Sequence, residues 1–215
     1  MLMSTVISGL LALTMGTEGV ASNDWLVRVR GVYLAPLQKN SDVLPTFTGG
    51  SADVLDTLSP EIDITYFFTP RWAVEVLGGV IPLDLDGTGI LEGLDEVGEV
   101  KAFPPTVLAQ YHLPKRGRLH PYVGVGVNYT KFYDAKPSRS LTDMAGDTTI
   151  NVDGSWGVAF QAGADIDIND KWVVNADLKW IQIDMEARLD PLGIPNTMDL
   201  DLDPIAVGIG VGRRF

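Results

Sequence analysis

The stretch Trp-Leu-Val-Arg-Val-Arg-Gly-Val-Tyr, residues 25–33, decides how the rest of the chain is interpreted. Its apolar side carries Trp25, Val27, Val29 and Tyr33, and its opposite side carries Arg28 and Arg30. Successive side chains of a strand point to opposite faces, so this strict alternation predicts a β-strand with one apolar and one polar face.

The same period of two returns along the rest of the chain. It covers seven further segments, residues 61–68, 72–80, 106–113, 122–129, 156–165, 172–180 and 205–215. Tight turns at 69–71, 115–118 and 169–171 alternate with long polar connections at 37–58, 83–100, 134–154 and 187–198. Short turns on one side and long loops on the other predict an all-β fold, an eight-stranded antiparallel transmembrane β-barrel with periplasmic turns and extracellular loops.

Composition limits the alternatives. The chain has 215 residues, of which 46% are hydrophobic, and a net charge of -12. A nucleic-acid partner would require a basic face, so none is expected. The absence of cysteine excludes disulfides and thiolate metal sites, and we expect no cofactor. After residue 27 no apolar run is long enough for a membrane helix, so a membrane protein of this sequence must cross as a closed barrel.

Aromatic residues indicate which face meets lipid. A soluble barrel also alternates, with its apolar face inside. Here the large aromatics share the apolar face and lie near strand ends, as in the girdles of outer-membrane barrels. The expected girdle is Trp25, Trp72, Tyr111, Trp156, Trp172, Trp180 and Phe215. We therefore predict a Gram-negative outer-membrane location; the alternative is a soluble barrel whose tryptophans cap its core.

The first 21 residues are interpreted separately from the barrel. Residues 6–15 form a short apolar core, and small residues end at Ala21, which predicts a signal peptide over 1–21 and a barrel over 22–215. No basic residue precedes the apolar core, and the alternative is an N-terminal helix attached to the barrel.

The polar face of the strands carries charges that would be buried inside the barrel. Buried charges are expected to pair. We predict an ion-pair network that plugs the periplasmic half, with a proton or ion path as the alternative; its members are Arg28, Arg30, Asp63, Glu75, Asp165, Asp177 and Lys179.

A second inward set is apolar. The candidate channel-lining residues are Leu34, Phe67, Leu77, Ile81, Phe103, Leu108 and Phe132, which could equally be core packing. Pro104 and Pro105 stand where a strand should begin. Proline cannot donate to a strand ladder, so this pair either interrupts pairing and creates a lateral opening or marks a loop-to-strand boundary.

No catalytic or metal site is predicted. Both histidines, His112 and His120, fall near a predicted periplasmic turn, and no nucleophile-elbow motif occurs. The stretch Asp84-Leu85-Asp86-Gly87 lacks the remaining ligands of a calcium loop.

Four segments together resemble the OmpW family, which includes alkane-uptake relatives such as AlkL. They are residues 103–111, residues 120–130, residues 155–165 with 169–172 after them, and the chain end, with Leu202-Asp203-Pro204 and Gly212-Arg213-Arg214-Phe215. Arg213 departs from the pattern, since the family usually has an aromatic there; an arginine at the rim can reach the headgroups.

The resemblance implies a function. It implies a narrow apolar passage through which small hydrophobic molecules enter from outside and leave sideways into the membrane through an opening in the wall. Expected partners are membrane lipid and lipopolysaccharide, such solutes, and the outer-membrane assembly machinery, to which the terminal Phe215 would be presented. The first functional hypothesis is a passive carrier. The second is a structural or surface-receptor barrel with a closed interior.

Overall fold

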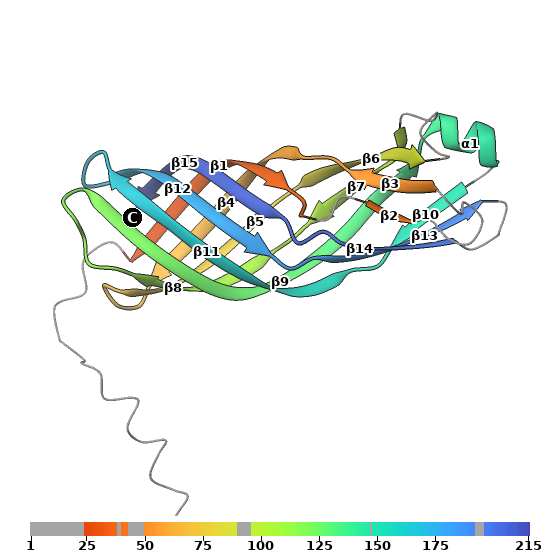
Figure 1. Ribbon diagram of the computed structural model, residues 1–215. Helices are drawn as coiled ribbons and strands as arrows, with labels where there is room; N and C mark the ends of the chain where they lie inside the picture. The colour runs from red at the N-terminus through yellow and green to blue at the C-terminus, as the bar shows by residue number, and fades with distance from the viewer. Residues whose placement is uncertain (1–23, 38–39, 43–49, 90–95, 147, 192–195) are drawn as a thin grey trace, which may run out of the picture.

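The computed structural model describes residues 24–37, 40–42, 50–89, 96–146, 148–191 and 196–215. The expected signal peptide, residues 1–21, lies outside the described residues. Eight antiparallel strands close into a barrel, as predicted, and the barrel continues at one end into an extension that carries the short helix α1 (Figure 1). Among the described residues, no helix is long and apolar enough to cross a membrane.

The barrel strands follow one another around the ring with no parallel pair. In ring order they are β1 (Trp25–Ala35), β4 (Thr57–Phe67), β5 (Trp72–Gly79), β8 (Thr106–His112), β9 (Leu119–Pro137), β11 (Ser155–Asp167), β12 (Trp172–Ile181) and β15 (Ile205–Arg214). Pairing of β9 with β11 and of β15 with β1 closes the ring. Closure leaves no free strand edge, whose backbone N–H and C=O groups would find no hydrogen-bond partner in lipid.

Short turns join the strands at one end of the barrel, which also holds Trp25 and Phe215. In the turn after β11, the Asn169 side chain accepts hydrogen bonds from the backbone of Lys171 at 2.9 Å and Trp172 at 3.0 Å. In the turn after β8, Gly117 has a φ of 65°, which favours glycine. These are the tight turns that the sequence predicts, and they form the periplasmic end.

Alternation along the strands turns the apolar side chains outward. Val29 on β1 is 54% exposed, whereas its neighbours Arg28 and Arg30 are 0% and 1% exposed. The outer surface of this part is therefore apolar, as a lipid-facing wall requires, and the polar side chains lie inside.

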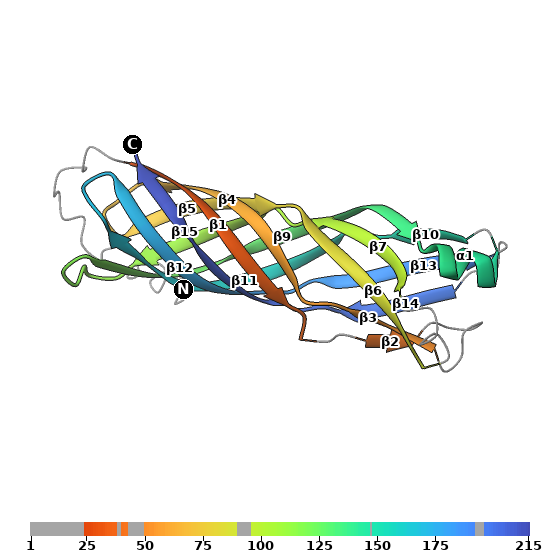
Figure 2. The same cartoon turned by 90° about the horizontal axis from the view of Figure 1, so that it is seen from above.

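Beyond the barrel, the long connections are mostly strands rather than the polar loops expected from sequence. One group, β2 (Asn40–Asp42), β3 (Gly50–Val54), β6 (Ile81–Gly89) and β7 (Glu96–Phe103), continues the sheet from the outer part of β9. A second sheet consists of β10 (Thr148–Val152), β13 (Asp184–Pro191) and β14 (Asn196–Asp201), and α1 (Arg139–Ala145) lies at the far end (Figure 2).

The loop prediction failed because the acids of these segments obscured a regular alternation. In β6, Leu83 and Leu85 are buried, while the intervening Asp84 is exposed. In β13, the buried Met185 lies between the exposed Asp184 and Glu186. The extension thus has the opposite arrangement to the barrel, with apolar side chains inside and charges outside.

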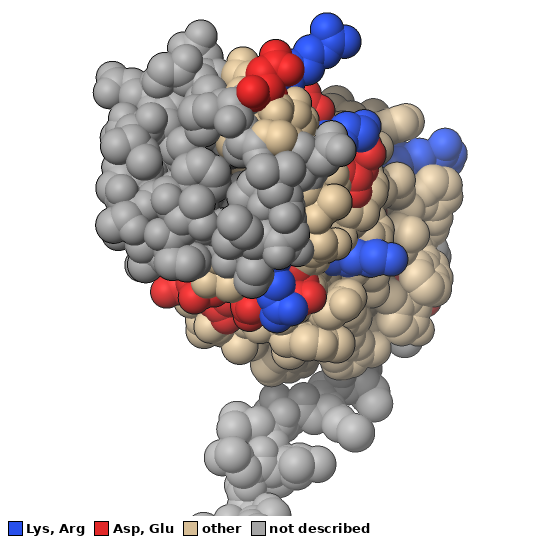
Figure 3. Space-filling model, turned by 90° about the vertical axis from the view of Figure 1, so that its right-hand side faces the viewer, with Lys and Arg blue, Asp and Glu red and all other residues tan. Residues whose placement is uncertain are grey.

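The end of the extension is charged. Seen from that end, side chains of both signs lie on the described parts of the surface (Figure 3). Arg188 pairs with Asp153 at 3.4 Å and with Glu186 at 3.0 Å. Nearer to the barrel, Lys101 and Lys136 pair with Asp134 at 2.6 and 2.9 Å, and these two contacts hold the pKa of Asp134 below its ordinary value.

Candidate functional site

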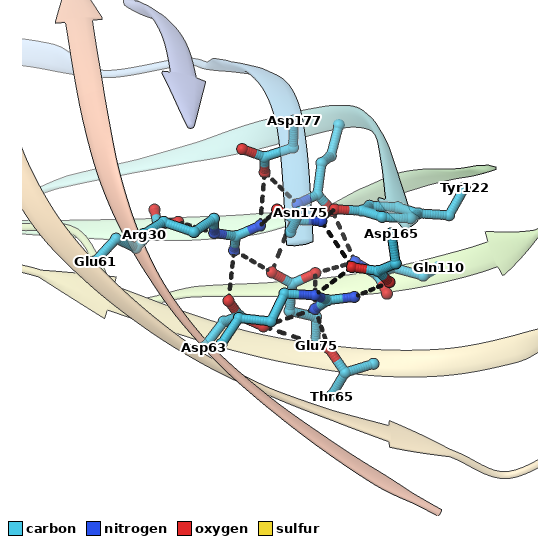
Figure 4. Close-up of polar contacts among 12 residues, drawn as sticks. Arg30, Glu61, Asp63, Thr65, Glu75, Gln110, Tyr122, Asp165, Asn175 and Asp177 are labelled. Carbon is cyan, nitrogen blue, oxygen red and sulfur yellow. Dashed lines mark hydrogen bonds and ion pairs between the residues drawn. The ribbon is translucent and has the colours of Figure 1, made fainter. Parts of the chain in front are cut away.

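The interior of the periplasmic half is filled by an ion-pair network centred on two arginines of β1 (Figure 4). Arg28 donates to Asp63 of β4 at 2.7 Å and to Asp165 of β11 through two nitrogens, at 3.0 and 2.8 Å. Arg30 contacts Glu75 of β5 at 2.7 Å. Arg30 therefore connects β1 to a strand two positions further around the ring.

The rest of the network consists of one lysine, further carboxylates and neutral donors. Lys179 of β12 contacts Glu61 at 2.9 Å and Asp177 at 2.8 Å, and Arg30 also reaches Asp177 at 2.8 Å. Side chains that sequence reasoning did not single out complete the set, namely Thr65, Gln110, Tyr122, Gln161 and Asn175. All of them lie at inward positions of the alternation, and this is the signal that would have found them.

The network closes this half to bulk water because its side chains fill an eight-stranded bore. Three cationic groups, Arg28, Arg30 and Lys179, meet five carboxylates, Glu61, Asp63, Glu75, Asp165 and Asp177. Such pairing offsets the cost of burying each charge. Below it, a cavity of about 550 Å³ opens at the periplasmic mouth and is lined in part by Phe67, His112 and Asp167.

The predicted channel-lining residues divide into three groups. Five are buried and point inward above the network: Leu34, Leu77, Ile81, Leu108 and Phe132. Phe67 lies at the periplasmic mouth, with its ring centroid 4.7 Å from that of His112. Phe103 was wrongly placed on the inner face: it is 41% exposed because Ala102 takes the inward position of β7, and its ring covers Gly78 from outside.

Two small cavities lie in the apolar half. Each has a volume of about 20 Å³, room for about one water molecule. Both are lined by Leu34 and Ile81; the upper one extends to Leu55 and Leu202, and the lower one reaches Lys179. Among the described residues, no group of His, Asp and Glu side chains is placed to hold a metal ion.

The wall beside these cavities lacks regular strand pairing. Pairing of β4 with β5 ends at Glu61 and Gly79, and pairing of β3 with β6 begins only at Val54 and Leu85. Between these points, two hydrogen bonds connect the described residues of the two chain segments: the Leu55 backbone N–H donates to the Asp84 carbonyl at 3.2 Å, and the Ser59 hydroxyl donates to the Val80 carbonyl at 2.7 Å.

Proline explains the interruption on one side of this segment. Pro60 has no N–H to donate toward β5, and the Ser59 hydroxyl bonds the Val80 carbonyl instead. Glycine allows the close approach of the two chains, because a Cβ on Gly79 would collide with the Pro60 carbonyl oxygen. Nothing in the sequence analysis singled out Pro60, although a proline beside a strand is a visible signal.

The pair Pro104 and Pro105 lies on the other side of the same segment. Pairing of β5 with β8 ends at Leu77 and Thr106, and pairing of β6 with β7 begins at Ile81 and Ala102 in the same register. On the β9 side, Tyr129 still donates its backbone N–H to the Pro105 carbonyl at 3.1 Å. Within the part of the chain that the structure describes, Gly78–Val80 therefore lacks ladder pairing on the β8 side, and Val80 lacks it on the β4 side as well.

The aromatics expected in the girdle all point outward. At the periplasmic end, Trp25 packs on Tyr66 with ring centroids 4.7 Å apart, and Trp72 packs on Tyr111 at 5.0 Å. At the other end Trp156 packs on Tyr129 at 4.8 Å, and Trp180 stacks on Phe160 at 5.8 Å. The guanidinium of Arg213 lies over the rings of Trp172 and Phe215, at 5.7 and 4.8 Å, so this departure from the family pattern is held within the aromatic rim.

Comparison with known proteins identifies the family, since the OmpW family model matches residues 21–215. The chain belongs to the OmpW family. It is 36% identical over 203 residues to the outer-membrane protein y4mB of Sinorhizobium fredii, covering 93% of this chain and 84% of that protein. The dibenzothiophene metabolism operon protein PahQ of Pseudomonas aeruginosa is 31% identical over 170 residues, covering 78% of this chain and 76% of that protein.

A solved structure shows the same architecture. The crystal structure of the outer membrane protein OprG from Pseudomonas aeruginosa superposes with a TM-score of 0.82 at 27% identity, covering 92% of this chain and 98% of that one. With the apolar outer wall, these matches establish that this OmpW-family chain is an outer-membrane β-barrel. The relative y4mB and the structural neighbour OprG are both named as outer-membrane proteins.

Proposed function

We propose that this barrel gives small hydrophobic molecules passive passage across the outer membrane. Solutes enter the apolar interior from the extracellular end and leave sideways into the membrane beside Gly78–Val80. The family resemblance supports this function, and the relative PahQ is named for an operon of dibenzothiophene metabolism, the metabolism of an apolar aromatic compound.

One observation carries the proposal. The apolar cavities lie directly inside the stretch of wall where ladder pairing is missing, since Ile81 lines both cavities and Pro60 and Pro104 line the lower one. A solute that reaches this level cannot continue downward, because the ion-pair network fills the bore. Sideways movement requires only that weakly paired chains separate, which costs fewer hydrogen bonds than opening a regular ladder.

The second hypothesis, a closed structural or receptor barrel, also has a specific observation in its favour. Each apolar cavity has a volume of about 20 Å³, room for about one water molecule, so the interior must widen before a hydrocarbon enters. Uptake measurements separate the two hypotheses, because a closed barrel gives none.

The passage is tested by filling it. Leu34 lines both cavities, and we expect Leu34→Trp to abolish barrel-dependent uptake of octane by cells that produce the protein at matched surface levels. The matched control is Leu178→Trp on the outward face of β12, where Leu178 is 51% exposed. Equal uptake with and without the wild-type barrel would contradict the proposed passage and support the closed-barrel hypothesis.

The exit is tested by a reversible cross-link. Glu61 and Gly79 are the last paired residues of β4 and β5; Pro60 immediately precedes Glu61, Val80 immediately follows Gly79, and both are exposed. Because the chain contains no cysteine, a Pro60→Cys, Val80→Cys variant can form only this disulfide. Oxidation should lower octane uptake toward the rate of barrel-free cells and reduction should restore it; unchanged uptake with a complete cross-link would place the exit elsewhere.

A further inference from the structure

The lower apolar cavity ends on two members of the ion-pair network. Its walls are aliphatic, from Val32, Leu34, Leu77, Ile81, Ile181 and Ala206. Its polar lining consists of Ser59, Glu61 and Lys179. The cavity is therefore amphipathic, with an apolar body and a charged end, which a site built only for hydrocarbons would not need.

At the charged end, one N–H group of Lys179 and one carboxylate oxygen of Glu61 lack hydrogen-bond partners among the described residues. The Lys179 ammonium has three N–H groups, and two have acceptors, Glu61 Oε1 at 2.9 Å and Asp177 Oδ2 at 2.8 Å. Its side chain is only 1% exposed, so bulk water does not supply the third acceptor. Glu61 Oε1 also lies 2.9 Å from Arg30 Nε in an ion pair without hydrogen-bond geometry, and its Oε2 has no partner among the described residues.

A hydroxyl group matches this end because it can accept from Lys179 and donate to Glu61. The cavity has room for about one water molecule, which could make the same two bonds. Replacing that water with an alkyl chain would lose these bonds, whereas replacing it with a solute hydroxyl would keep them. Five carboxylates against three cationic groups in the network make an additional carboxylate unfavourable.

We propose that Lys179 and Glu61 form a head-group site for apolar solutes that carry a neutral hydroxyl, such as alkanols. The hydroxyl binds between the two side chains, and the tail follows the aliphatic wall toward Gly78–Val80. This site deepens the proposed function and rests on it for the direction of travel, but binding at the site is measurable on its own.

Binding is measured on the refolded, methyl-labelled barrel in lipid nanodiscs with 1-octanol as the probe. We expect magnetisation transfer between the oxygen-bearing methylene of 1-octanol and the methyl groups of Ile181 and Leu34, which line the cavity. The test variant is Glu61→Gln with Lys179→Met, which preserves the net charge of the network and should lose these signals. The matched control, Lys101→Met with Asp134→Asn, removes an ion pair from the outer surface and should retain them.

Competition in cells gives the second readout. The concentration of 1-octanol that halves octane uptake should be about fivefold lower for the wild type than for the double variant, the effect of roughly one net hydrogen bond. Octanoate should compete poorly with both. Absence of the magnetisation transfer, or its retention in the double variant, would overturn the head-group site. Octane uptake that does not depend on the barrel, with the transfer present, would overturn the proposed function instead.

Discussion

The membrane half and the extracellular extension use the same alternating pattern with opposite faces turned inward. Strand β9 runs through both halves. In the membrane half its outward side chain Val125 is apolar and its inward Asn128 is polar; further out, Phe132 points inward and Lys131 outward. The change occurs at the ring pair of Tyr129 and Trp156. A period of two therefore specifies a strand but not the solvent on either side of it.

The length of β9 shows why both halves are needed. It has 19 residues, and at roughly 3.3 Å per residue it spans roughly 60 Å, far more than a tilted strand needs to cross a bilayer. The outer part of β9 must therefore lie outside the bilayer, in water. Its apolar face can be buried only against the other extension strands, which is why an apolar interior exists above the polar plug.

The largest expected effect is on the polar interior of the membrane half. Arg28→Met leaves Asp63 and Asp165 buried without their main partner, and we expect a loss of about 3–5 kcal/mol in the free energy of unfolding. Urea unfolding of the refolded barrel in lipid vesicles measures it. Arg213→Met, at the exposed rim, should cost about 1 kcal/mol or less; equal losses would show that the network does not stabilise the barrel.

A medium effect should distinguish the outer surfaces of the two halves. Val125→Lys places a charge on the lipid-facing side of β9 and should cost about 2–4 kcal/mol in the free energy of unfolding. Tyr133→Lys makes the same replacement eight positions along the strand, on the extension, and should stay within about 0.5 kcal/mol. The same unfolding assay compares them, and similar costs would mean that both positions meet the same solvent.

The smallest effect concerns the exposed ion pairs of the extension. Lys101 and Lys136 hold the pKa of Asp134 below its ordinary value of 3.8. A lowered folded-state pKa contributes stability above the ordinary pKa, and this contribution is lost as the pH falls through the folded-state value. Thermal unfolding of wild type and Asp134→Asn should therefore differ slightly near neutral pH and converge as the pH falls from 3.8 through the lowered folded-state pKa. A difference that grows in acid would contradict this sign.

The sequence predicted the barrel well because each membrane strand alternates over about ten residues and each periplasmic turn has clear turn residues. It did not predict the extension, because Leu83-Asp84-Leu85-Asp86 has the charge density of a loop although it alternates. The error at Phe103 has a different origin, because the alternation places Ala102 and not Phe103 at the inward position of β7. The inward charges were predicted as a set, but not their partners, since Arg28 and Asp165 are 137 positions apart.

The interruption in the wall could be predicted only in part. The pair Pro104 and Pro105 is visible in the sequence, and its effect on pairing was one of two interpretations. That Pro60 and Gly79 meet beside it follows only from the register of β4 against β5. The proposed passage with its exit therefore depends on the alignment of three strands, which no local sequence pattern contains.

The most direct test of the two-solvent arrangement is a cysteine scan of the outward positions of β9. Single cysteines at 123, 125, 127, 131 and 133 are unambiguous because the chain has none of its own. A water-soluble maleimide should label 131 and 133 on intact cells and leave 123, 125 and 127 unlabelled until the membrane is dissolved. Equal labelling of Val125→Cys and Tyr133→Cys on intact cells would contradict a strand that passes from lipid to water at Tyr129.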